Sequence, residues 1–595
     1  MRKSLAALSF LALLASCSRR EPASPGFDFD TLASVAVLDG GRHKPLDTQA
    51  RELLHELTGK ENFRGFKGPD GAFVEVFPSA HPVESVIRMA AQPEVYKSKP
   101  LIRIQFPEVR EKYGKDRSRQ YFSPEELTRS AGELQRELEE ISRMEAKDRR
   151  PYHRAVQHLA EQMGVVRTIF DEVRFQIVPT PYGEKSRWPS IVDLEGYLEE
   201  GDRVRGQNPS GDIKAFLDVM DRFDRAKLKR IVDLWGSLKK NLAEGKAADF
   251  NRAAAELRDA LKTLNPVSYL PEDKIQVELF YNAFRPFTKA WLWGYGPGVL
   301  FFLLSFAFSS SRFRALGLAA LLAGIALHVY GYVLRWQIAA RYPLANMYES
   351  MIAMGLLLAL IGTAMEFIMK SRVFGISAAT IATLCVVAAE EITIFSPFVS
   401  QQQPALLNEV LMTIHVPTIM AAYGCGLLCT GVGFAYILTW LFAPHKEETL
   451  RHLDLCLYRI LQITTLLLIG GISLGAVWAG EAWGRWWGWD QKEVWSLITL
   501  LWYLAMLHAR FTGKVKGLLL ANAALVGFAV IMLSYVGVNI LFGTGLHSYG
   551  HVLGATWGPL LGIFAVEAAL ILTSAVVYLR RRAHGQARIP SEIPG

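Results

Sequence analysis

Tryptophan is concentrated in one short stretch of this chain. Seven of the fourteen tryptophans lie between Trp478 and Trp502, and five of those seven fall within residues 478–489. Three glycines are interleaved with these five rings, and glycine lets a backbone and a flat ring approach closely. An indole has an apolar body and a polar N–H, so it favours the boundary between membrane and water. We therefore predict a broad aromatic floor that faces water and suits a large planar ligand; the alternative is an enlarged interfacial belt.

Two histidines are placed to act beside this floor. His415 lies at the predicted outer end of the apolar segment 411–442 and precedes Pro417, and His547 lies in the segment 543–550. Imidazole is the usual strong protein ligand of haem iron. Two imidazoles, with a porphyrin resting on indole rings, make a coherent haem site. The alternative for a single histidine at a helix end is a polar interface residue.

Two further histidines lie within apolar segments, where an ionisable group is costly and usually has a partner. His508 lies well inside its segment. His328 reaches a similar depth only if its helix extends outward to about Ala340. Arg335 and Arg341 would tolerate that extension by snorkelling towards the headgroups. A second haem between these helices is one prediction, and a polar packing or interfacial residue is the alternative for each histidine.

Charged residues follow the last tryptophan of the loop. Asp490 and Glu493 have the spacing of a capping box at the start of a helix. In the functional alternative, Lys492 or Arg485 pairs with the propionates of haem, since arginine binds carboxylates well.

The elements that position these residues are apolar segments of about 20 residues, which is enough to cross a bilayer. Nine such segments occur, at about 291–310, 315–335, 347–370, 374–394, 411–442, 456–478, 494–511, 516–542 and 557–579. Basic residues then gather on one side, near Arg312, Lys370, Lys446, Arg510 and Arg580. The positive-inside rule makes that side the cytoplasm. The N-terminal part, the tryptophan stretch and residues 543–556 are then expected outside.

The N-terminus is typical of an export signal. Arg2 and Lys3 precede an apolar run, Leu5–Ala15, as in a secretory signal peptide. The run ends in Leu14-Ala15-Ser16-Cys17, which resembles the box cut by the lipoprotein signal peptidase, and Cys17 would then be lipidated. The alternatives are a plain cleaved signal and an uncleaved anchor.

Residues 20–285 are rich in charge and predict a soluble domain. A strand over 35–38 is followed by a turn at 39–41. Helical patterns cover 123–175, beginning with Ser123 as cap, and 211–264, ending at Asn265-Pro266. These patterns by themselves indicate no function for this domain.

The composition argues against several classes of protein function. The net charge of +8 over 595 residues falls largely in short loops and the tail, and no basic patch is interleaved with aromatics on a soluble element, so nucleic-acid binding is not expected. Five cysteines are too few for a disulfide scaffold. Cys425 and Cys429 lie one helical turn apart without an acidic or histidine partner nearby, which argues against a metal pair.

The run Trp483–Trp495, WGRWWGWDQKEVW, closely resembles the tryptophan-rich "WWD" signature of haem-handling proteins in cytochrome c maturation. Residues 343–350, PLANMYES, and the GVN and GLHSYG segments within 537–550 resemble CcsA (ResC-type), the membrane subunit of the System II cytochrome c synthase. The resemblance covers about 330–560. The family pattern usually reads WDPKE, and Gln491 stands here in place of the proline, a small departure at the junction of loop and helix.

The resemblance implies roles by position. His415 and His547 match the two outer histidines that hold haem beside the WWD loop. His508 matches an intramembrane histidine whose partner, in fused synthases, comes from a ResB-like (CcsB) subunit. That subunit is not recognised in this sequence, so His328 is a candidate for the missing ligand. The residues implied to contact haem at the loop are Trp483, Trp486, Trp487, Trp489 and Asp490.

These observations together predict an all-α polytopic membrane protein of about nine transmembrane helices, preceded by a mainly α, extracytoplasmic soluble domain. The predicted divisions are a signal peptide at 1–17, a soluble domain of unknown role at 18–287, a CcsA-like transmembrane haem-handling domain at 288–583 with its WWD loop at 478–495, and a cytoplasmic tail at 584–595. Residues 41–48 and 278–282 resemble parts of N-terminal extensions found on some CcsA-type proteins.

The reaction implied is that of a cytochrome c synthase, or haem lyase, which joins haem b to an exported apocytochrome c. Two cysteine thiols of a CxxCH segment add across the two haem vinyl groups, so the substrate supplies the nucleophiles and no side chain of this chain needs to. The enzyme contributes positioning, which can supply about 7–11 kcal/mol. The implied partners are the apocytochrome, a ResB-like subunit and thiol-reducing proteins, at a bacterial inner (cytoplasmic) membrane.

Two other classes stay open at this stage. A haem carrier or exporter can share the WWD signature without ligase activity. A respiratory membrane subunit can hold electron-transfer haems between histidine pairs, but it needs no indole floor at the surface.

Overall fold

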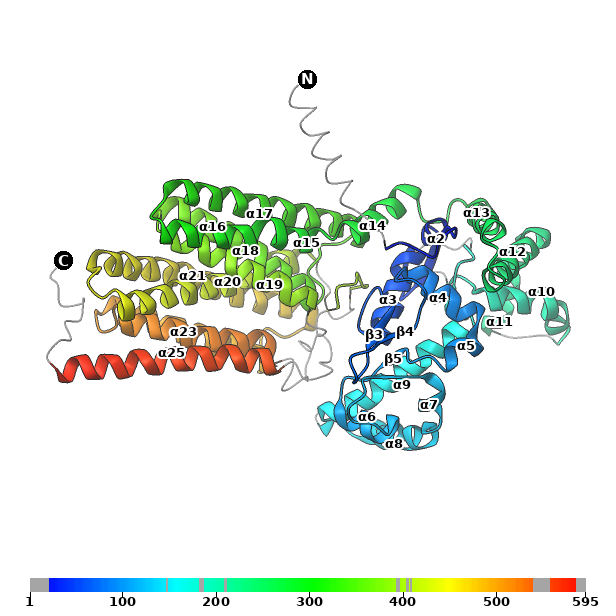
Figure 1. Cartoon of the computed structure of the whole chain (residues 1–595), viewed down its shortest axis with the longest axis horizontal. Coiled ribbons are helices and arrows are strands. Elements are labelled where there is room, and N and C mark those ends of the chain that lie inside the picture. The colour runs from blue at the N-terminus through cyan, green and yellow to red at the C-terminus, as the bar shows by residue number, and fades with distance from the viewer. Residues whose placement is uncertain are drawn as a thin grey trace, which may run out of the picture. The chain divides into compact units, whose positions relative to one another are not determined.

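The computed structural model describes residues 21–145, 148–180, 187–207, 211–391, 396–402, 406, 409–538 and 557–584 (Figure 1). The chain forms two compact units. The first contains the chain up to Arg285 together with Phe398–Gln401, and the second contains Pro286–Pro397 and the chain from Gln402 onward. The predicted signal peptide, 1–17, lies outside the described residues, and the role of each predicted domain stays a prediction.

The first unit is mainly helical, with three short antiparallel strand pairs. Its helices are α2 (Phe29–Ala33), α3 (Leu46–Thr58), α4 (Pro82–Ala91), α5 (Pro93–Lys97), α6 (Pro107–Gly114), α7 (Pro124–Thr128), α8 (Ala131–Arg143), α9 (Pro151–Phe170), α10 (Ile191–Gly206), α11 (Gly211–Met220), α12 (Arg225–Ala243), α13 (Ala247–Leu264) and α14 (Glu272–Phe284). Its strands are β1 (Ala36–Asp39), β2 (Arg42–Pro45), β3 (Gly65–Lys67), β4 (Phe73–Glu75), β5 (Ile102–Arg103) and β6 (Tyr121–Phe122).

Local sequence signals explain several of these elements. The predicted strand and turn form a hairpin in which β1 pairs with β2 and Ala36 lies opposite Pro45. Gly40 and Gly41 both have positive φ in its turn, which glycine adopts without steric cost. Ser123 caps α7 in a full capping box, as expected from its neighbours. The helical pattern over 123–175 corresponds to three helices, α7, α8 and α9.

The two segments that resemble family extensions meet in the folded unit. Arg42, on β2, donates from both terminal nitrogens to Glu278 on α14, at 2.8 Å each. Thr48 Oγ1 donates to Glu278 Oε1 at 2.8 Å. Asn282 Nδ2 donates to Asp47 Oδ2 at 2.9 Å. A buried polar network therefore ties α14 to the hairpin and to α3.

An ion pair keeps this network charged. Burial alone would raise the pKa of Asp47, but Arg51, whose Nε lies 2.9 Å from Asp47 Oδ2, and the amide of Asn282 together lower that pKa below its usual value. The Asp47 carboxylate thus stays ionised, where an uncompensated buried charge would be costly.

The second unit consists of long apolar helices that run side by side (Figure 1). Its elements are α15 (Pro286–Lys289), η2 (a π-helical turn, Ala290–Tyr295), α16 (Gly296–Ala307), α17 (Ser311–Ala339), α18 (Met347–Met369), α19 (Val373–Glu391), α20 (Glu409–Phe442), α21 (Glu447–Trp483), α22 (Gln491–Phe511), α23 (Leu518–Met532), η4 (a π-helical turn, Leu533–Gly537) and α25 (Trp557–Ala583).

Nine helical spans among the described residues are long and apolar enough to cross a membrane, which confirms the predicted fold class. The first begins at Glu272, so it starts earlier than the apolar pattern suggested. Helix α20 packs along α21, α23 and α18 and is the centre of the bundle. The helix is continuous across Pro417.

We expect Glu278→Ala to destabilise the first unit by about 2–3 kcal/mol, because Arg42 would lose its bidentate partner in a desolvated setting. Thermal denaturation of the full chain in detergent, with hydrogen exchange at α3 and α14, measures this. Asp273→Ala changes an exposed acid on the same helix and is the matched control. Equal protection of α14 in both variants would contradict the structural importance of the network.

Candidate functional site

His415 is held in one orientation by the neighbouring helix. It lies on α20, and its Nδ1 lies 2.8 Å from the carbonyl oxygen of Gly471 on α21. A carbonyl only accepts, so Nδ1 carries a proton, and in the neutral imidazole Nε2 then carries the lone pair. The imidazole ring is nearly parallel to the Trp478 ring, at 13° and 6.1 Å between centroids. A histidine whose one nitrogen donates to a backbone carbonyl is oriented as metal-binding histidines usually are.

Glycine at position 475 makes room for this ring. A β-carbon at Gly475 would lie 2.6 Å from His415 Cε1, and one at Gly471 would lie 3.1 Å from the Cα of Ile419. Both distances are shorter than ordinary van der Waals contact. Gly470 is different, because a β-carbon there would be 4.0 Å from its nearest neighbour, Thr418. The close approach of α20 and α21 therefore depends on Gly471 and Gly475.

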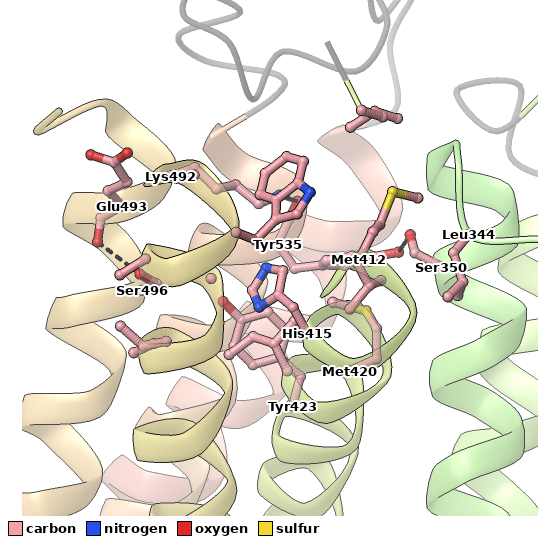
Figure 2. Close-up of a pocket in the computed structure, with 18 of the residues that line it drawn as sticks. Leu344, Ser350, Met412, His415, Met420, Tyr423, Lys492, Glu493, Ser496 and Tyr535 are labelled. Carbon is pink, nitrogen blue, oxygen red and sulfur yellow. Dashed lines mark hydrogen bonds between the residues drawn. The ribbon is translucent and has the colours of Figure 1, made fainter. Parts of the chain in front are cut away.

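His415 lines a mostly apolar pocket with a cavity volume of about 140 Å³ (Figure 2). The pocket lies between α18, α20, α21, α22 and η4. Residues from these elements and from the adjoining loops line it: Leu344, Ala345, Asn346, Met347, Ser350, Leu406, Met412, His415, Val416, Ile419, Met420, Tyr423, Ile472, Gly475, Ala476, Trp478, Ala479, Trp486, Trp487, Lys492, Glu493, Ser496 and Tyr535. Pockets that bury a whole small ligand span roughly 300–1,000 Å³, so this one would enclose part of a large ligand.

One wall of the pocket is fixed by a buried carboxylate. Glu349, on α18, has no exposed surface and accepts from Arg335 Nε at 3.0 Å and from Arg341 Nη1 at 2.9 Å. It also accepts the backbone N–H of Ala345 at 2.7 Å, and Ala345 lines the pocket. The loop before α18 is thus fastened by charge-assisted hydrogen bonds, which are stronger than neutral ones.

The predicted snorkelling of Arg335 and Arg341 is wrong. Helix α17 does extend outward, to Ala339, but Arg335 is fully buried and Arg341 nearly so. The cause is Glu349: pairing with a buried carboxylate satisfies both guanidinium groups inside the protein, whereas snorkelling would leave Glu349 as an unpaired charge.

The tryptophan loop has a defined backbone. Gly484 ends α21 in the left-handed conformation, and Asp490 begins α22 with the predicted capping box to Glu493. Glu493 also accepts from Arg485 Nη1 at 3.0 Å and from the N–H of Gly488 at 2.7 Å. A β-carbon at Gly488 would collide with the Arg485 side chain. Glu493 thus organises the loop as well as the helix that follows it.

The indole rings do not form a single flat layer. Trp478 and Trp483 meet edge to face at 68°, and Trp487 and Trp489 at 84°. Trp486 lies against Gly480, where a β-carbon would be 3.3 Å from its Nε1, and it is 65% exposed. Trp478, Trp486 and Trp487 line the pocket, whereas Trp489 is 69% exposed on the loop.

The pocket-lining helices coincide with a known sequence family. The family model of the cytochrome c assembly protein matches residues 344–547. The cytochrome c biogenesis protein CcsA of Prochlorococcus marinus strain AS9601 is 33% identical over 252 residues, which cover 37% of this chain and 80% of that protein. CcsA of strain MIT 9312 is 34% identical over the same length and the same shares.

The chain belongs to the CcsA family of cytochrome c biogenesis proteins. The protein NrfI of Wolinella succinogenes is 28% identical over 536 residues, which cover 86% of this chain and 53% of NrfI. The chain therefore spans about half of the length of that relative. The matched share is larger than the second unit, so the likeness extends into the first unit. Among solved structures, cytochrome c haem lyase CcmF is similar with a TM-score of 0.36 and 18% identity, over 49% of this chain and 50% of that one.

The other predicted CcsA-family site residues that the structure describes lie apart from the His415 pocket, except for Trp486 and Trp487. His547 lies outside the described residues. His328 is fully buried, its Nδ1 lies 3.0 Å from the Tyr295 hydroxyl, and its Nε2 has no hydrogen-bond partner in the described chain. His508 lies in the last turn of α22 and is exposed. Neither His328 nor His508 lines the pocket, and neither do Trp483, Trp489 and Asp490. These assignments stay predictions.

Sequence reasoning missed Glu349 and Tyr535. An acid within the apolar segment 347–370, preceded by two arginines, was a visible signal of a buried ion-pair cluster. Tyr535 carried no such signal. Its hydroxyl lies 2.7 Å from that of Ser350 and donates to the Met347 carbonyl at 3.2 Å, and this link joins η4 to α18.

We expect Gly475→Ala to lower the stability of the membrane unit by about 1–3 kcal/mol, because the new β-carbon would clash with the His415 ring. Gly470→Ala should instead be neutral or stabilising by up to about 1 kcal/mol, since alanine has the higher helix propensity and meets no close neighbour. Thermal denaturation in detergent compares the two. Equal shifts in melting temperature would show that α20 and α21 are not closely packed at His415.

We expect Glu349→Ala to cost about 3–5 kcal/mol, because it leaves two buried guanidinium groups without their carboxylate. Glu391→Ala removes an exposed acid from α19 and should leave the melting temperature in detergent unchanged. Replacing Arg335 and Arg341 by methionine together with Glu349→Leu should recover most of the loss. A Glu349→Ala variant as stable as the control would contradict the buried cluster.

Proposed function

We propose that this protein acts in cytochrome c maturation by binding haem at the His415 pocket and presenting it to the CxxCH cysteines of an exported apocytochrome c. The observation that supports this most is His415, an imidazole whose Nδ1 is committed to the Gly471 carbonyl and whose ring lines an apolar, tryptophan-walled pocket. In its neutral form, such a group presents the Nε2 lone pair to a metal.

The pocket suits the shape and chemistry of a porphyrin. Its lining is mostly apolar and includes the indoles of Trp478, Trp486 and Trp487, and such walls suit a flat hydrophobic ligand. The enclosed volume takes only part of the ring, so the remaining surface of haem would stay accessible to a second protein. That accessibility is what a presenting enzyme needs.

His547 would supply the second iron ligand. It lies in the segment that follows Tyr535, a pocket residue, and twelve residues of chain can extend over about 40 Å. Two imidazoles would hold the iron until the histidine of the incoming CxxCH segment replaces one of them.

The chemistry needs no nucleophile from this chain. Each substrate thiol adds across one vinyl group: the sulfur forms a bond to carbon, and its hydrogen ends on the neighbouring carbon, so no external oxidant or reductant is consumed. The protein supplies orientation, which is worth about 7–11 kcal/mol when two reactants are well placed. A fixed imidazole and a packed pocket wall serve that purpose.

Haem transfer would take place on the outer face of a bacterial inner membrane. The basic loops at Lys446 and Arg510 and the triple arginine at the end of α25 share one side of the bundle by chain order, which the positive-inside rule assigns to the cytoplasm. The tryptophan loop and the first unit then face the periplasm. A ResB-like subunit would complete the complex at the exposed His508, and thiol-reducing proteins would keep the substrate cysteines reduced.

We expect the double variant His415→Ala, His547→Ala to abolish covalent haem attachment and the co-purification of haem. The measurement is co-expression with an apocytochrome c, and with a ResB-like protein in a parallel arm, in a host that lacks its own maturation system, followed by haem staining of the denatured cytochrome. His445→Ala, which removes an exposed loop histidine, is the control. Added imidazole should restore part of the activity.

Two outcomes of this experiment would contradict the proposal in different ways. Retained attachment in the double variant would overturn the assignment of the iron ligands. Haem that co-purifies with the native protein, without covalent product in either arm, would instead indicate a carrier.

A further inference from the structure

Lys492 is a cation that lines the pocket and forms no salt bridge among the described residues, although Asp490 is near enough to interact with its charge. It is the second residue of α22 and points into the same pocket as His415, which comes from α20 (Figure 2). Its Nζ donates to the backbone carbonyl of Tyr535 at 3.3 Å and lies 5.4 Å from the centre of the Tyr535 ring. Within the described chain, no acid lies within ion-pair distance of this ammonium group.

The two acids nearest to Lys492 in the sequence already accept hydrogen bonds from other groups. Glu493 accepts from Arg485 and from the N–H of Gly488. Asp490 caps α22 by accepting from the N–H of Glu493 at 2.9 Å. Arg485, the other cation of the loop, is thus committed to Glu493, and this leaves Lys492 as the cation that faces a ligand.

A second donor lines the same pocket. The indole nitrogen of Trp487 is buried and has no hydrogen-bond partner among the residues that the structure describes. A buried N–H without an acceptor costs about 1–3 kcal/mol. A ligand with a carboxylate would satisfy this N–H and would neutralise Lys492 at the same time.

We propose that Lys492 and Trp487 bind a propionate of the porphyrin and so fix its rotation about the axis through the iron. This inference rests on the function proposed above and adds the recognition of one ligand group to it. Iron ligation alone leaves the ring free to turn about the His415 Nε2–iron direction. One anchored propionate removes that free rotation and restricts the vinyl groups to the few positions that the anchor allows, which helps two specific thioether bonds to form.

The test compares iron protoporphyrin with its dimethyl ester, in which both carboxylates are masked. The full chain is purified in detergent and titrated with each ligand, and the Soret absorbance is followed. The native protein should prefer the free acid about tenfold or more, because hydrogen bonds to charged groups are strong in a desolvated site. Lys492→Met should remove most of that preference, whereas Lys492→Arg should retain it.

Matched variants separate recognition from packing. Trp487→Phe keeps a ring and removes the N–H, and it should lower the preference by about fivefold. Lys514→Met removes an exposed lysine and should leave the preference unchanged. If Lys492 only tied α22 to η4, Lys492→Met would weaken both ligands equally, and the proposal would be overturned.

The two titrations distinguish failure of propionate recognition from failure of the proposed haem-binding function. A native protein that binds both porphyrins equally refutes propionate recognition and leaves haem binding intact. A native protein that binds neither refutes the proposed function itself.

Discussion

The contact between α20 and α21 at His415 is the constraint on which the rest of the site depends. It requires two glycines on α21, because one backbone carbonyl must reach the imidazole and one side of the ring must pass over a position without a β-carbon. Both conditions are met only if the two helices stay in one axial register. That register also brings Trp478 against the ring and ends α21 where the tryptophan loop begins. The same packing therefore orients the imidazole of His415 and sets the point at which the aromatic loop begins.

Charge within the bundle divides into two kinds. The carboxylate of Glu349 is shared by Arg335 and Arg341 and by a backbone N–H, so this group is satisfied within the protein and shapes the wall of the pocket. Lys492 has a carbonyl oxygen instead of a carboxylate. A half-buried cation held this way is less favourable than one with an anion beside it. Ligand binding would lower that cost, so Lys492 would act as a recognition group, whereas the Glu349 cluster is structural.

Much of the architecture could be predicted from the sequence because it rests on local signals. Apolar segments of sufficient length gave the membrane spans, Gly40-Gly41 gave the hairpin turn, and Asp490 with Glu493 gave the start of α22. Pairings between distant segments left no such signal. The bond from His415 to Gly471 and the link from Tyr535 to Ser350 depend on which helices become neighbours. How the indole rings pack on one another also left no such signal: Trp478 meets Trp483 and Trp487 meets Trp489 edge to face, an arrangement that aromatic pairs favour.

The reaction proposed for this site explains why a rigid scaffold would suffice. When the substrate supplies both thiols and the cofactor supplies both vinyl groups, a side chain that moves protons adds little, and the barrier falls chiefly through placement. Placement needs three fixed references: an axial ligand, a plane and a rotation about the axis. In the proposed function, His415 would provide the first, and the packed walls beside Trp486 and Trp487 would provide the second. A directional contact at the rim of the ring would provide the third, and Lys492 and Trp487 carry donors that face the pocket.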